Sequence, residues 1–61
     1  MKRIDNLYGE AYNAAINNTV TEMKEAFGFE MDPADELEVE SMANLYGFWF
    51  DDNGELTAPE A

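Results

Sequence analysis

The chain contains neither cysteine nor histidine, and it is only 61 residues long. Disulfide frameworks and zinc sites built from thiolates and imidazoles, which stabilise many very small domains, are therefore excluded. A domain of this length buries only about 60% of the surface that its unfolded chain exposes. Hydrophobic residues nevertheless make up 46% of the sequence, well above the content of a disordered chain. We expect one folded domain over residues 1–61, stabilised by packing alone and without a cofactor.

The N-terminal part has the spacing of an amphipathic helix. Between residues 4 and 16 the apolar or small residues recur at i, i+3, i+4 and i+7, namely Ile4, Leu7, Tyr8, Ala11 and Ala15. Asn17-Asn18-Thr19 then interrupts the helical composition, and Thr19 with Glu22 matches a capping box. A single helix over residues 4–27 would rotate its apolar face by roughly 120°. The pattern therefore favours a break near Thr19.

A second helix is expected from Thr19 to Phe27, with Val20, Met23 and Phe27 on its inner face and Gly28 as its stop. Residues 29–31 alternate in polarity and fit either a short strand or an extended link. Asp32-Pro33 is a standard helix start, so a further helix should run from about Pro33 to Tyr46 and stop at Gly47. Its inner face would hold Val39, Met42, Ala43 and Tyr46.

Leu37 does not lie on the inner face of this expected helix, which leaves a short strand over residues 37–40 as an alternative. The aromatic run 48–50, the turn residues 51–54 and the returning residues 55–57 predict a C-terminal β-hairpin. An isolated hairpin is marginal in water, so it should pack on the helices, pair with residues 29–31 or pair with another copy. Residues 58–61 are expected to fray. The fold class is α+β, two or three short helices followed by the hairpin, with an all-α bundle as the alternative.

Catalytic side chains are scarce. Ser41 is the only serine, and Lys24 is the only lysine besides Lys2. An activated nucleophile with an orienting base is therefore not available. The oxygen donors around Gly54 were compared with a calcium loop: aligning Gly54 with the invariant glycine places Trp49 at the first ligand position. A hairpin turn explains these residues better. The sequence therefore predicts a protein that is not an enzyme and binds no metal.

Charge is the most informative property for function. Fourteen Asp and Glu against three Lys and Arg give a net charge of −11. A sphere of this mass is about 27 Å across, and that length of duplex DNA carries roughly 16 charges. Such a field repels nucleic acid and anionic lipid but accelerates encounter with basic surfaces. Without a secretory signal or an apolar run long enough for a membrane, we expect a cytoplasmic protein that contacts neither nucleic acid nor membrane directly.

The carboxylates are densest between residues 30 and 40, where they occupy six of eleven positions: Glu30, Asp32, Asp35, Glu36, Glu38 and Glu40. Asp32, Glu36 and Glu40 recur at i+4 and would line one edge of a helix. One interpretation is a solvated face that aids solubility and complements the helix dipole, and a halophilic origin would also give acidity. The functional interpretation is that the carboxylates imitate a row of phosphates.

In size, charge and lack of catalytic groups, the chain resembles the small acidic inhibitors of phages and mobile elements, the anti-CRISPR and anti-restriction proteins that act as DNA mimics. The resemblance implies stoichiometric inhibition of a basic nucleic-acid-binding protein or complex, in the cytoplasm of a bacterial host if the protein is phage-encoded. The contact set that it implies is Glu22, Glu25, Glu30, Asp32, Asp35, Glu36, Glu38 and Glu40.

Two other functions remain open from the sequence. In the hairpin, Phe48 and Phe50 would share one face and Trp49 the other, so Trp49 is either partly covered or the anchor of an apolar interface. The second reading describes an antitoxin-like or regulatory binding module. A third possibility is a homo-oligomeric structural protein that pairs through the exposed hairpin strand. The chain is accordingly expected to be a monomer or a homodimer.

Overall fold

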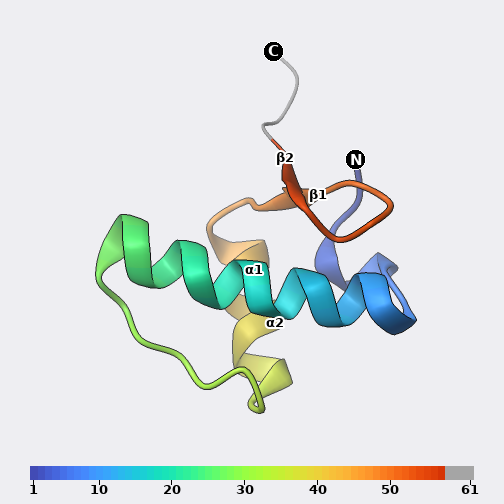
Figure 1. Ribbon diagram of the computed structural model, residues 1–61. Coiled ribbons are helices and arrows are strands. Elements are labelled where there is room, and N and C mark those ends of the chain that lie inside the picture. Colours follow the sequence, from blue (N-terminus) through green and yellow to red (C-terminus); the bar gives the residue numbers. More distant parts are fainter. Residues whose placement is uncertain (58–61) are drawn as a thin grey trace.

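The computed structural model describes residues 1–57 and has the predicted α+β architecture, helices followed by a C-terminal antiparallel hairpin (Figure 1). A short 3₁₀ turn, η1 (Ile4–Asn6), precedes the long helix α1 (Gly9–Phe27). The second helix, α2 (Glu36–Leu45), crosses α1, and the strands β1 (Trp49–Phe50) and β2 (Leu56–Thr57) follow it. The predicted tail, residues 58–61, lies outside the described residues.

Helix α1 runs without interruption through residues 17–19, so the predicted break is wrong. Thr19 is fully buried, and its hydroxyl donates to the carbonyl of Ala15 at 2.8 Å instead of capping a new helix. Asn18 donates its side-chain amide to the carbonyl of Gly54 at 2.8 Å. The expected rotation of the apolar face does not arise, because residues 4–7 precede the helix and the buried positions of α1 form one stripe: Ala15, Ile16, Thr19 and Met23.

The C-terminal end of α1 lies where the sequence predicted it. Gly28 adopts a left-handed conformation with φ of 66°, and its N–H donates to the carbonyl of Lys24 at 3.0 Å. The N–H of Phe29 donates to the carbonyl of Met23 at 3.1 Å. These two bonds satisfy carbonyls that the end of a helix leaves unpaired.

Helix α2 begins three residues later than predicted. The carboxylate of Asp32 accepts from the N–H of Ala34 at 2.9 Å and forms a turn that contains Pro33. Asp35 is the actual N-cap, and its side chain accepts from the N–H of Glu38. The alternative of a strand over residues 37–40 is wrong, because these residues belong to α2. Residues 29–31 form a link without regular secondary structure.

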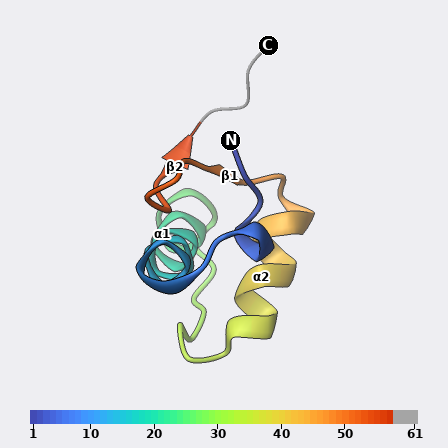
Figure 2. The same cartoon turned by 90° about the vertical axis from the view of Figure 1, so that its right-hand side faces the viewer.

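The hairpin pairs Trp49 with Thr57 and Phe50 with Leu56. The outer edge of β1 is covered by the N-terminal segment, because Lys2 and Phe50 exchange two backbone hydrogen bonds of 2.8 Å each. The outer edge of β1 therefore pairs with the N-terminal segment and not with residues 29–31. In Figure 2, which looks nearly along α1, the hairpin lies above both helices and the N-terminal segment passes between them.

The core lies between the two helices, η1 and the hairpin (Figure 2). Its buried members are contributed by every element except β2: Ile4, Leu7, Ala15, Ile16, Val39, Ala43 and Phe50. Tyr8, expected on the apolar face of the N-terminal helix, is 81% exposed, because α1 begins only after it. Phe27 and Tyr46, expected on inner helix faces, are also exposed, at 54% and 44%. Both lie at helix ends, beyond the point where α1 and α2 cover each other.

Candidate partner-binding surface

Five carboxylates lie on the link between the helices and on the first turn of α2. Glu30 and Asp32 belong to the link, Asp35 caps α2, and Glu36 and Glu38 follow it; all five are exposed. We call these five residues the acidic segment. No lysine or arginine follows Lys24 in the sequence. The negative charge of the segment is therefore offset only by Lys24, whose Nζ lies 3.6 Å from a carboxylate oxygen of Glu30. An exposed pair of this kind contributes little to stability.

The structure does not arrange these carboxylates in the predicted row. Asp32 lies outside α2, so only Glu36 and Glu40 keep the i, i+4 relation on the helix. Glu38 is rotated by about 200° from both of them, on the opposite flank. The charges therefore lie on two sides of the N-terminal half of α2 and do not follow one edge.

Glu40 is half-buried and accepts a hydrogen bond from the hydroxyl of Tyr12 on α1. Burial raises the pKa of Tyr12 above its ordinary value of 10.0, and the hydrogen bond to Glu40 and the charges of Glu40 and Glu36 raise it further. Tyr12 is therefore a neutral donor at physiological pH. The pair joins α1 to α2, which gives Glu40 a structural role and removes it from the freely exposed set.

Glu22 and Glu25 lie on a different flank of α1 from the link. Glu22 is one turn beyond Asn18, which faces the hairpin turn, and Glu25 continues that flank. Lys24 is rotated by about 200° from Glu22 and lines a shallow hollow with Val20, Glu30, Met31 and Asp32. The eight-residue contact set implied by the resemblance is thus divided between one flank of α1 and the link with the first half of α2.

Trp49, the other candidate anchor, is half-buried on β1. The guanidinium of Arg3 lies over its indole ring at 5.5 Å from the centroid, a cation–π arrangement. Arg3 and Lys2 form the basic part of the molecule, and Lys2 also pairs with Asp52 at 3.2 Å. One face of the indole is therefore covered by the chain's own cation.

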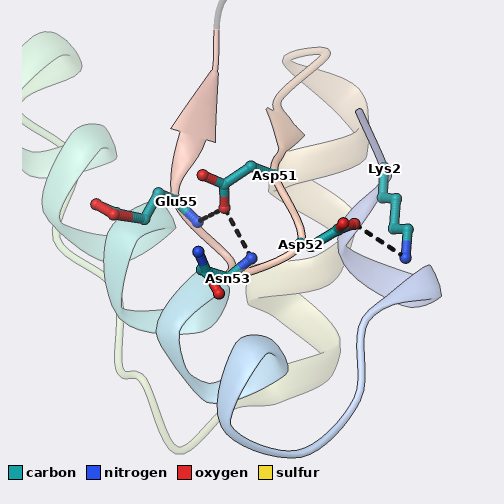
Figure 3. Close-up of polar contacts among 5 residues, drawn as sticks. All are labelled: Lys2, Asp51, Asp52, Asn53 and Glu55. Carbon is teal, nitrogen blue, oxygen red and sulfur yellow. Dashed lines mark hydrogen bonds and ion pairs between the residues drawn. The ribbon is translucent and has the colours of Figure 1, made fainter.

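The oxygen-rich hairpin turn is shown in Figure 3. One carboxylate oxygen of Asp51 accepts from the N–H groups of Asn53 at 2.9 Å and Glu55 at 3.0 Å. Asp52 points toward Lys2. Asp51 thus shapes the turn, as the hairpin interpretation expected. Within residues 1–57, no group of three acidic side chains is close enough to hold a metal ion.

An exposed aromatic patch was not foreseen. The rings of Phe27 and Tyr46 lie 4.8 Å apart between centroids, and those of Tyr46 and Phe48 lie 6.3 Å apart. We call these three residues the aromatic patch. Phe27 is the last residue of α1 and Tyr46 caps α2, and each directly precedes a glycine with positive φ, Gly28 or Gly47. That adjacency is the signal in the sequence, because a residue at the end of a helix has helical neighbours on one side only.

Comparisons with protein-family models, with curated proteins and with solved structures give no match for this chain. Among the described residues, no helix has both the length and the apolar character needed to cross a membrane.

Proposed function

We propose that this protein is a non-catalytic inhibitor that acts as a DNA mimic. It occupies the basic surface on which a bacterial defence complex, of the CRISPR or restriction type, holds nucleic acid, and it blocks access of the target DNA. The observation that carries the proposal is the acidic segment: five exposed carboxylates on consecutive elements, accompanied by a single neighbouring cation among residues 1–57.

The dimensions of the molecule support this proposal. Its longest axis is 28 Å, and duplex DNA of that length carries roughly 16 phosphate charges. The net charge of −11 is within a factor of two of that value. A basic groove built for DNA therefore meets a body of comparable charge per length, and the long-range attraction accelerates their encounter.

The positions of the carboxylates refine the proposed contact set. Glu40 is engaged by Tyr12, and Glu22 and Glu25 lie on the flank of α1 away from the link. The acidic segment is the part that one partner surface covers at once. The mimicry is one of charge density, since the side chains on α2 do not repeat with the regularity of a phosphate backbone.

The experiment that tests the function is capture from a bacterial lysate that contains CRISPR and restriction complexes, with the protein immobilised. We expect retention of a nucleic-acid-binding effector at about 0.05 M NaCl and its release at about 0.5 M, because exposed charge pairs are screened. Duplex or single-stranded DNA added at low salt should displace the same effector. A captured partner that resists both salt and DNA would contradict the proposal.

A further inference from the structure

The aromatic patch exposes two large aromatic side chains. Phe27 and Tyr46 are 54% and 44% exposed, and their rings pack on each other at an interplanar angle of 56°. Phe48 is half-buried and connects the patch to the core. Clustered exposed aromatic side chains mark interaction sites, and the rings of Phe27 and Tyr46 already pack against each other.

The patch lies at the C-terminal ends of both helices, on a chain of net charge −11. Figure 1 shows the C-terminal end of α1 and the turn after α2 on the same side of the molecule. A helix C-terminus carries a partial negative charge, and the last turn of α2 contains no basic residue to offset it. Lys24, one turn before Phe27, is paired with Glu30. Aromatic faces in such a field attract cations, because the ring quadrupole and the helix ends act in the same direction.

We propose that the aromatic patch binds an arginine side chain of the basic partner, with the guanidinium stacked on the rings of Phe27 and Tyr46. Arginine is favoured over lysine because its planar, weakly hydrated guanidinium stacks on aromatic faces, whereas an ammonium group keeps its water. The inference rests on the proposed function and deepens it: the acidic segment attracts the partner, and the patch selects arginine within its basic surface.

A second copy of the chain is a poorer occupant of the patch. Each copy carries a net charge of −11, so two copies repel each other. The two associations also differ in the sign of their salt dependence. Salt strengthens self-association by screening repulsion, and it weakens the binding of a cation by screening attraction.

The test uses nona-arginine and nona-lysine, two peptides of equal charge, with affinity measured by calorimetry at low salt. We expect nona-arginine to bind about threefold more tightly, a ratio typical of a cation–π contact at an exposed site, and to shift the ring NMR signals of Phe27 and Tyr46. The double variant Phe27→Leu with Tyr46→Leu keeps apolar side chains but removes the π faces. It should bind both peptides equally and with the affinity that the unmodified protein has for nona-lysine.

The matched control is Tyr8→Leu, which removes an 81% exposed ring at the opposite end of α1. It should keep the preference for arginine, and circular dichroism should show native helix content in both variants. Equal binding of the two peptides by the unmodified protein, or a preference that survives in the double variant, would overturn the inference and leave the proposed function standing. Binding of neither peptide would overturn both. Ring shifts that depend on protein concentration and grow with salt would assign the patch to self-association.

Discussion

Gly54 has a structural role that no other residue type can fill. It lies in the hairpin turn with φ of 82°, is buried, and faces α1 so closely that a Cβ atom would collide with the carbonyl oxygen of Ala11 and lie 3.0 Å from the Cβ of Ala14. Its own carbonyl accepts from Asn18. The absence of a side chain therefore allows the hairpin to pack on α1.

Gly54→Ala should lower the free energy of unfolding by about 3 kcal/mol, because left-handed strain and the collision add. Gly47→Ala is the matched control: its φ is 72° but nothing lies near the added atom, so strain alone should cost about 1 kcal/mol. Urea unfolding measures both values. Equal losses in the two variants would show that the hairpin does not pack as described.

Tyr12 predicts a pH dependence. Its pKa is raised in the folded protein, so its contribution to stability is fully present below the unfolded value and is lost as the pH rises above about 10. At pH 7, Tyr12→Phe should cost about 1.5 kcal/mol, because Glu40 loses its donor. At pH 11 the difference between the two proteins should be clearly smaller. A difference that stays constant between these pH values would contradict the assignment.

At the scale of elements, α1 shows how a local signal is overridden. Thr19 and Glu22 match a capping box, but a buried threonine can also bond the carbonyl four residues back, and the sequence does not distinguish the two. Tertiary contact decides, since Thr19 packs in the core and Asn18 reaches the hairpin. By contrast, Gly28 and the hairpin turn were predicted correctly, because positive φ and turn chemistry are local properties.

A pair of asparagine substitutions tests the continuity of α1. Asn17 is exposed in the middle of the helix, so Asn17→Ala should stabilise the protein by about 0.5 kcal/mol through helix propensity. Asn18→Ala gains the same propensity but loses the bond to Gly54 and should destabilise by about 0.5 kcal/mol net. Thermal unfolding followed by circular dichroism shows whether each substitution raises or lowers the stability of the protein. Destabilisation by Asn17→Ala would indicate a break after all.

The surface was predicted less completely than the fold. Composition identified the acidic stretch between Glu30 and Glu40, and the exposure of the acidic segment within it follows directly from its polarity. The arrangement of the carboxylates depends on where α2 begins, and that was set by the competition between Asp32 and Asp35 for the capping role. The aromatic patch depends on the meeting of two helix ends that are distant in the sequence, which periodicity within one helix cannot reveal.

At the scale of the whole molecule, uncompensated charge should weaken the fold. Like charges one helix turn apart cost a few tenths of a kcal/mol each, and salt screens them. Raising NaCl from about 0.02 M to about 0.5 M should therefore increase the free energy of unfolding by about 1 kcal/mol. Stability that falls with added salt would contradict a surface dominated by repulsion.

The central claim is that the acidic segment, and not net charge alone, binds the partner. Two variants separate the contribution of the acidic segment from that of net charge, and each variant loses five negative charges. The segment variant carries Glu30→Gln, Asp32→Asn, Asp35→Asn, Glu36→Gln and Glu38→Gln, which keeps side chains able to cap at positions 32 and 35. The control variant carries Glu10→Gln, Glu22→Gln, Glu25→Gln, Asp52→Asn and Glu55→Gln.

The decisive measurement is the affinity of each variant for the DNA-displaceable effector, by calorimetry at one fixed salt concentration. Five exposed pairs, at a few tenths of a kcal/mol or more each, predict at least a tenfold loss for the segment variant. The control variant should stay within about threefold of the unmodified protein, since it loses only long-range attraction. Equal losses in the two variants would contradict the account and leave only a general effect of acidity.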